Sequence, residues 1–108
     1  MDFLFVEQIE CGEFKIKLRK PYRFGLNFTE EYYIVDDDYL DIHICEKNID
    51  EVKRSISQEF VFLYNAYAEE KDENLTKGAQ VLKRKIIDLI EGVYYDRYQY
   101  EAIGTGVT

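Results

Sequence analysis

One histidine and a group of aspartates close to it are the residues best suited to chemistry in this sequence. His43 lies two residues before Cys45, and alternate residues of a β-strand share a face, so both side chains could meet one metal ion. A zinc site needs three or four ligands, which Cys11 and Asp41 would have to complete. The ligand spacing typical of metal-binding motifs is absent, so we predict an exposed histidine beside a small, half-buried cysteine, with no metal and no other cofactor.

Carboxylates gather just before the histidine, at Asp36, Asp37, Asp38 and Asp41. Paired carboxylates can hold magnesium or act as general acid and base, so a small metal-dependent hydrolase that uses this cluster and His43 is one open interpretation. The glycine and the distal glutamate of a calcium-binding EF-hand loop are missing. The other interpretation is a solvated turn between two strands, and we assign no catalytic residue.

The wider segment 30–51 is strongly acidic. It has nine acidic side chains and one basic side chain, an excess of eight that equals the net charge of −8 of the whole chain. Such a segment can steer a basic protein partner toward itself. We therefore predict a partner-binding surface whose members are Asp36, Asp37, Asp38, Tyr39, Asp41 and His43.

Basic residues alternate along another predicted strand, at Lys15, Lys17 and Arg19. An RNA-binding sheet is a further open interpretation, because alternating basic side chains on one wet face can line a phosphate path. The alternative is the ordinary exposed face of an amphipathic strand. The chain has 22 acidic residues against 14 basic ones, which disfavours direct binding to nucleic acid.

Length and composition indicate one folded domain. The chain has 108 residues, of which 46% are hydrophobic and 16% are aromatic, and this is enough to bury a core. Its apolar runs are far shorter than the ~20 residues of a membrane span, and an export signal is absent, so we expect a cytoplasmic protein with reduced cysteines. We expect a single domain over residues 1–103 and a frayed tail at 104–108.

The first part of the chain, residues 2–45, has the alternating pattern of β-strands. Apolar residues fill both phases of the first strand, so we expect it to be covered on both faces. The second strand begins at Phe14 and should end at Pro21, because proline interrupts a ladder of backbone hydrogen bonds. Further strands are predicted at 22–28, 32–35 and 39–45.

Two helices are predicted after these strands. Asn48 and Glu51 have the spacing of a capping box, and an apolar stripe follows them to Tyr67. Thr76 is the candidate N-cap of the second helix, whose apolar stripe runs on to Val93. The tyrosine-rich stretch 94–100 fits either a last helical turn or an added strand. A run of strands followed by a run of helices predicts an α+β fold. We expect a mainly antiparallel sheet of about four to five strands (residues 2–45), followed by two α-helices packed on one face.

The stretch from residue 32 to about residue 68 resembles the HicB-like antitoxin superfamily. The resemblance rests on an extended pair at 33–35 and 40–44, a short polar joint, and the helix opening Asn48-Ile49-Asp50-Glu51-Val52. It covers about half of the chain, and Val52 stands where an alanine is common. It implies a small, partial RNase H-like domain, often dimeric, that acts as the antidote to a small basic ribonuclease.

Ten tyrosines in 108 residues are more than a core of this size needs. Exposed tyrosine is favoured at protein interfaces, since it combines a large apolar area with a hydrogen-bonding group. As a set, the tyrosines therefore favour an oligomer or a partner surface. Together with the resemblance, they lead us to expect a homo-oligomeric, dimeric interaction module that is not an enzyme. Its acidic segment would cover the small basic toxin protein that the resemblance implies.

Overall fold

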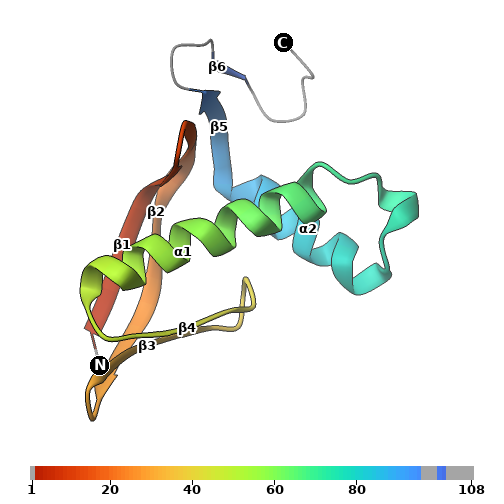
Figure 1. The fold of residues 1–108 in the computed structure, drawn as a ribbon. Helices are drawn as coiled ribbons and strands as arrows, with labels where there is room; N and C mark the ends of the chain where they lie inside the picture. Colours follow the sequence, from red (N-terminus) through yellow and green to blue (C-terminus); the bar gives the residue numbers. More distant parts are fainter. Residues whose placement is uncertain (1, 96–99, 102–108) are drawn as a thin grey trace.

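A computed structural model describes residues 2–95 and 100–101 of the chain and shows an α+β fold (Figure 1). The elements in chain order are β1 (Asp2–Cys11), β2 (Phe14–Thr29), β3 (Tyr32–Asp37), β4 (Ile42–Glu46), α1 (Ile49–Leu63), the π-helix η1 (Tyr64–Ala68), the 3-10 helix η2 (Asp72–Asn74), α2 (Lys77–Leu89), β5 (Ile90–Tyr95) and β6 (Tyr100–Glu101). The predicted fold class is confirmed. The tail predicted at 104–108 lies outside the described residues.

The long strand β2 organises the sheet, because it has partners along both of its edges. β1 pairs with one edge, while β5 pairs with residues 14–18 and β3 with residues 26–29 of the other edge. β4 extends the sheet beyond β3, and β6 extends it beyond β5. Every one of these pairings is antiparallel, as the sequence predicts.

Pro21 does not end a strand, so the prediction of two strands here is wrong. β2 continues through it, but the pairing with β1 is irregular at this point. Val6 pairs with Tyr22 and Gln8 with Lys17, so that four residues of β2 lie opposite Glu7 alone. Pro21 also lies between the segments of β2 that pair with β5 and β3, where its missing N–H costs no ladder hydrogen bond.

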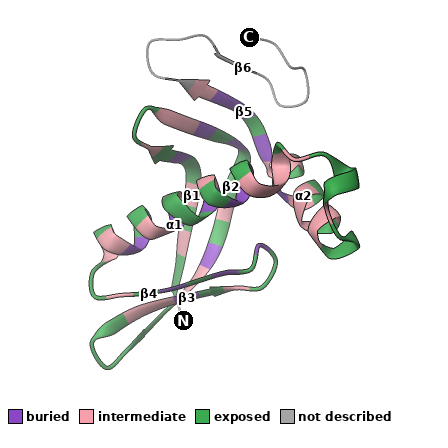
Figure 2. Ribbon diagram, turned by 45° about the vertical axis from the view of Figure 1, so that its right-hand side comes forward, coloured by how far each residue is buried: buried purple, intermediate pink, exposed green. Residues whose placement is uncertain are grey.

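The expectation that the first strand is covered on both faces is also wrong. Leu4 and Val6 are half-buried toward α1, whereas Phe3 is 45% exposed and Phe5 is 62% exposed on the opposite face. Apolar residues in both phases of a strand predict two covered faces only if a second layer is present. Among the described residues, only one face of this part of the sheet has a helix across it (Figure 2).

The helix α1 begins where the capping-box pattern predicts. Asn48 is its N-cap, and the side-chain oxygen of Asn48 accepts a hydrogen bond from the backbone N–H of Glu51 at 2.9 Å. The predicted apolar stripe is confirmed, because it supplies the side of α1 that faces the sheet. Its buried members are Val52, Ile56, Phe60 and Leu63, followed by Tyr64 in η1.

The second helix ends earlier than predicted. Thr76 caps it as expected, but α2 stops at Leu89, and the chain enters β5 directly at Ile90. Ile90 and Val93 are buried in the sheet beside β2 rather than on a helix. The helical spacing of apolar residues continues from α2 into β5, so the sequence pattern does not mark the end of the helix. Residues 90–95 are extended because they pair with the edge of β2.

The predicted strand at 39–45 also starts later than expected. Residues 38–41 form a turn, and β4 starts at Ile42. Its alternation is as predicted, with Ile42 and Ile44 buried and His43 and Cys45 exposed. None of the helices in the described part of the chain is long and apolar enough to cross a membrane.

Candidate protein-interaction surface

The β3–β4 hairpin brings together the residues that the sequence predicts as a partner-binding surface. Asp36 and His43 lie directly opposite each other in the register of the two strands. The last residue of the turn between the strands is Asp41, whose φ of 57° lies in the left-handed region. Aspartate adopts that region more readily than most residues, which explains how this short acidic turn closes without glycine.

His43 is held between two carboxylates on the exposed face of the hairpin. Its Nδ1 lies 2.9 Å from Oδ1 of Asp36, and its Nε2 lies 3.0 Å from Oδ1 of Asp41. Both nitrogens can donate only when the ring is protonated, because a neutral imidazole has a single N–H. The hydrogen bonds to Asp36 and then to Asp41 therefore raise the pKa of His43 above its ordinary value of 6.5.

The two carboxylates beside His43 argue against a metal ion at this histidine. A metal ion needs a ring nitrogen with a free lone pair, whereas each ring nitrogen of His43 lies within hydrogen-bonding distance of a carboxylate. Within residues 2–95 and 100–101, no three side chains of the ligating types gather as a metal site. In this geometry, Asp36, His43 and Asp41 form a hydrogen-bonded clamp across the hairpin.

Asp37 is half-buried, whereas the other aspartates of the cluster are exposed. Its carboxylate accepts hydrogen bonds from the hydroxyl of Tyr22 on β2 and from the backbone N–H of Leu40, the latter at 2.9 Å. Leu40 itself is fully buried. The predicted cluster is therefore divided, because Asp37 fixes the turn, while Asp36, Asp38 and Asp41 are exposed.

Tyr39 occupies the tip of the turn and is 48% exposed. The ammonium group of Lys85 on α2 lies 4.6 Å from the centre of its ring, and Lys85 also donates to the backbone carbonyl of Tyr39 at 3.3 Å. These contacts fix the ring of Tyr39 in place while leaving half of it accessible. Lys85 is 46 residues away in sequence, and no local pattern indicates this contact.

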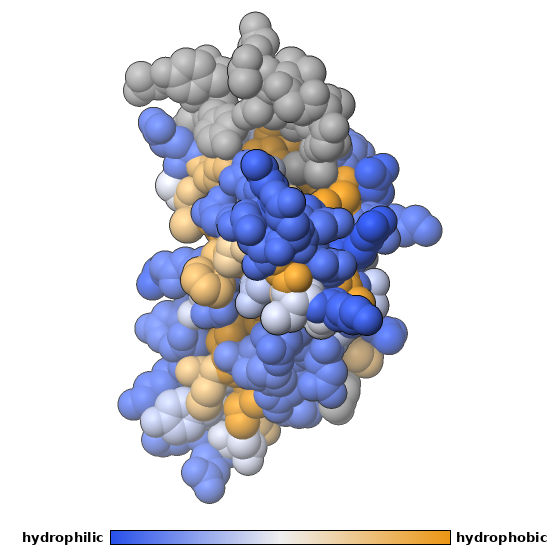
Figure 3. Space-filling view, turned by 90° about the vertical axis from the view of Figure 1, so that its right-hand side faces the viewer, coloured by the Kyte–Doolittle hydropathy of each residue, from blue (hydrophilic) through white to orange (hydrophobic). Residues whose placement is uncertain are grey.

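The acidic charge is unevenly distributed over the chain. Segment 30–51 has nine of the 22 acidic residues and one of the 14 basic residues, so the rest of the chain has 13 of each. The excess of eight acidic residues in this segment, which equals the net charge of −8, therefore lies in β3, β4, their flanking turns and the first turn of α1. Figure 3 shows the side of the molecule with α2 and the β3–β4 turn, where hydrophilic residues cover most of the surface.

The predicted basic strip lies on the first part of β2, away from β3. Lys15 lies 3.8 Å from a carboxylate oxygen of Glu10, and Lys17 lies 3.5 Å from one of Glu91. Arg19 lies in the irregular part of β2, two residues before Pro21. Neighbouring acids thus offset part of the positive charge that would have to attract RNA.

The tyrosines, which the sequence suggests as interface residues, differ in how far they are buried. Tyr32 is exposed like Tyr39, whereas Tyr33 and Tyr94 are half-buried and Tyr64 belongs to the core. The side chains of Tyr95, Tyr98 and Tyr100 lie outside the described part of the chain. The exposed set includes phenylalanines that the tyrosine count does not reveal, at Phe3, Phe5, Phe28 and Phe62.

The hairpin thus has an acidic, exposed surface, and specific contacts hold several of its residues. Asp37 anchors it to β2, His43 links two of its carboxylates, and Lys85 holds Tyr39 at its tip. These contacts describe the chemistry of the surface and do not assign it to a family. Comparison of the chain with family models, with curated proteins and with solved structures finds no match in any of the three.

Proposed function

We propose that this protein is a non-enzymatic interaction module that binds a small basic protein through its β3–β4 hairpin. In the form that the HicB-like resemblance implies, the partner is a small basic ribonuclease toxin, and binding neutralises it in the cytoplasm. The observation that carries the proposal is the location of the whole net charge of −8 in the segment that forms this hairpin and its flanks.

The hairpin contacts support a binding role because they hold the acidic side chains in fixed positions. Side chains that are already ordered lose less conformational entropy when a partner binds. Asp36 and Asp41 are held by His43, and the half-exposed ring of Tyr39 is held by Lys85. A rigid aromatic side chain surrounded by charges is a common centre of a protein interface.

The same contacts favour binding over the two other interpretations. A hydrolase that used His43 and the aspartates would need an available ring nitrogen, which the clamp does not offer. An RNA-binding sheet would need unpaired basic residues, but Lys15 and Lys17 each lie beside a glutamate. The acidic segment has an excess of eight charges of one sign, against five basic residues on β2.

The test begins with isolation of the tagged protein from its native cells and identification of what co-purifies in stoichiometric amount. We expect a small basic protein whose ribonuclease activity falls when this protein is added. The association rate constant of the purified pair is then measured over a range of salt concentrations. The triple variant Asp36→Asn, Asp38→Asn, Asp41→Asn should associate about tenfold more slowly at low salt, and the difference should shrink at high salt.

A matched control removes the same charge from elsewhere. The variant Glu69→Gln, Glu73→Gln, Asp88→Asn changes three exposed acids outside the hairpin. We expect it to associate nearly as fast as the wild type, because steering depends on where the charge lies. Equal slowing in both variants, or recovery of the protein alone as a clean oligomer, would contradict the proposal.

Dimerisation is part of the same proposal. It is supported by the exposed aromatic rings outside the hairpin, among them Phe5 and Phe28 at 62% and 61% exposure. The molar mass of the purified protein, measured by light scattering over a range of concentrations, tests it. A mass equal to that of one chain of 12.9 kDa at every concentration would exclude it.

A further inference from the structure

We propose that the free edge of β1 binds an extended segment of a partner protein, in which basic and apolar residues alternate, by adding it to the sheet as a further strand. The inference rests on the proposed function in one respect only, since both take the partner to be basic. It concerns a different surface, because β1 and the acidic hairpin lie on opposite sides of β2.

The first observation is the unpaired edge itself. β1 is a strand of ten residues, and in the described part of the chain β2 is its single strand partner. Its second edge therefore presents backbone N–H and C=O groups that can form a new ladder. Strand addition is an established mode of peptide recognition, in which main-chain hydrogen bonds supply affinity and side-chain pockets supply specificity.

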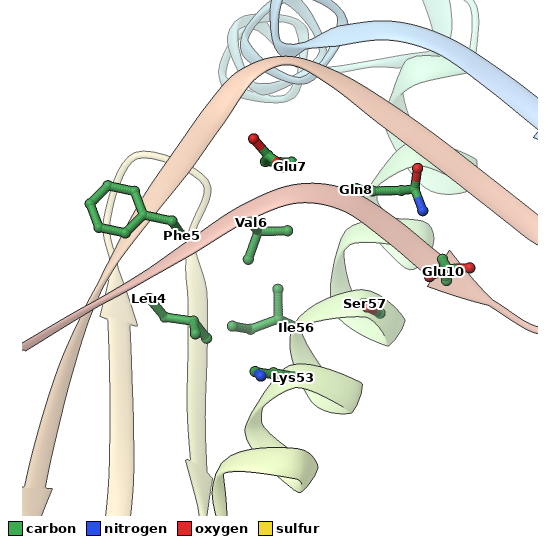
Figure 4. Close-up of a pocket in the computed structure, with 9 residues that line it drawn as sticks. All are labelled: Leu4, Phe5, Val6, Glu7, Gln8, Glu10, Lys53, Ile56 and Ser57. Atoms are coloured by element: carbon green, nitrogen blue, oxygen red, sulfur yellow. The ribbon is translucent and has the colours of Figure 1, made fainter.

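The second observation is a hollow of about 330 Å³ between β1 and α1. In Figure 4, Leu4 and Val6 point from β1 toward Ile56 on α1, and Lys53 and Ser57 lie on the helix beside them. Leu4 and Val6 are incompletely buried, so apolar surface remains to be covered. Every second side chain of an added strand would point toward the helix, as these two residues do, and an apolar one would fill the hollow.

The third observation is charge, which indicates the partner's other side chains. β1 has three acidic residues, Asp2, Glu7 and Glu10, and no basic one. The strand that already pairs with β1 has the complementary pattern, since β2 has five basic residues and no acidic one. Glu10 and Lys15 show the resulting contact across the strands, with 3.8 Å between the charged atoms.

The same charges argue against a second copy of this chain at the edge. Pairing of β1 with β1 would bring together six carboxylates without a basic residue between them. Like charges on paired strands are destabilising, and edge charges of this kind prevent self-association. A strand with alternating basic and apolar residues, like the first part of β2, would instead pair opposite charges with the acidic residues of β1.

The test uses a defined peptide and the full chain. The probe is a capped peptide of alternating lysine and valine, about seven residues long, which matches a typical strand. We expect saturable binding in fluorescence anisotropy and slower hydrogen exchange at amides of β1. A glutamate–valine peptide of the same length should bind at least about tenfold more weakly, which corresponds to about 1.4 kcal/mol.

A second peptide separates strand addition from simple charge attraction. Methylation of alternate backbone nitrogens along one edge of the lysine–valine peptide removes donors and leaves its charge unchanged. We expect this peptide to lose binding, because the ladder needs those N–H groups. Equal binding of the methylated peptide, or an absence of added protection in β1, would overturn the inference.

Variants of the protein locate the site. Ser57→Trp would fill the hollow from α1 and should weaken binding at least about tenfold, whereas Gln58→Trp, on an exposed position of the same helix, should change it less than about twofold. Glu7→Gln should weaken binding more than Glu73→Gln, which removes the same charge from η2. Equal effects within either pair would exclude this site.

The hairpin variant distinguishes this inference from the proposed function. The protein with Asp36→Asn, Asp38→Asn and Asp41→Asn should bind the lysine–valine peptide with an affinity within about twofold of the wild type, because those residues do not line the hollow. If that variant loses the peptide, the peptide binds at the hairpin and the inference is wrong. If the association test fails while β1 still binds the peptide, the proposed function alone is wrong.

Discussion

The hydroxyl of Tyr22 on β2 donates a hydrogen bond to the carboxylate of Asp37 on β3, with oxygen–oxygen distances of 2.8 and 3.0 Å. Tyr22 lies in the part of β2 that pairs with neither β3 nor β5. The bond therefore replaces missing backbone pairing and holds the acidic hairpin against the centre of the sheet. Burial, and then the hydrogen bond to Asp37, raise the pKa of the Tyr22 hydroxyl.

Removal of the Tyr22 hydroxyl should loosen the hairpin. Tyr22→Phe leaves the ring in place and deprives a half-buried carboxylate of its donor, so we expect a loss of about 1–2 kcal/mol in the free energy of unfolding. Urea denaturation measures it. Tyr32→Phe, at an exposed position of β3, is the control and should change stability by less than about 0.5 kcal/mol. An equal effect in both variants would show that the Tyr22 bond does not stabilise the hairpin.

Asp37 and Asp38 are neighbours of equal charge with different roles. Asp37→Asn weakens the bonds from Tyr22 and from the N–H of Leu40, and we expect it to cost about 1–2 kcal/mol of stability. Asp38→Asn removes the same charge from an exposed position and should cost less than about 0.5 kcal/mol. Chemical denaturation of the two variants under identical conditions makes the comparison, and similar losses would contradict the structural role of Asp37.

The His43 clamp should make stability depend on pH. Because the pKa of His43 is raised in the folded protein, the native state binds this proton more tightly than the unfolded state does. The stabilisation is therefore complete below pH 6.5 and is lost as the pH rises through the raised pKa. NMR titration of the single histidine measures that pKa directly.

The matched variant for the clamp is His43→Gln, which retains hydrogen-bonding groups and cannot titrate. Its urea midpoint should vary less with pH than that of the wild type between pH 6 and about pH 9. A pKa of His43 at or below its ordinary value of 6.5 would show that the two carboxylates do not hold the protonated ring.

The helix caps provide a test of local stability. Asn48→Ala removes the acceptor for the N–H of Glu51, and Thr76→Ala removes the acceptor for the N–H of Ala79. We expect each substitution to lower the free energy of unfolding by about 1 kcal/mol. Gln58→Ala, on the exposed side of α1, is the control and should leave it within about 0.5 kcal/mol of the wild type.

Local sequence patterns predicted several parts of the fold correctly. Both caps, at Asn48 and Thr76, were identified because a capping side chain and its partner lie within three residues. The alternation of Ile42 and Ile44 with His43 correctly predicts the buried face of β4, although the predicted strand starts three residues too early, at Tyr39. The acidic segment was evident from charge alone. These features depend on residues that are near one another in the chain.

Features that depend on distant residues could not be predicted in this way. Val93 fits the stripe of a helix, and it lies in a strand because β2 offers an edge to pair with. Lys85 contacts Tyr39 across 46 residues of the chain, and Tyr22 contacts Asp37 across 15. The difference between the half-buried Asp37 and its exposed neighbours therefore required the tertiary structure.

The α+β class, the helix starts and the acidic character of segment 30–51 follow from the amino-acid sequence alone, because propensity, periodicity and charge are local properties. Only the tertiary structure decided that Pro21 lies within a strand, that His43 joins Asp36 to Asp41, and that β1 has a free edge beside α1. Each of these depends on which strands pair and in what register. Strand register is set by contacts between segments that are far apart in the chain, which no local pattern contains.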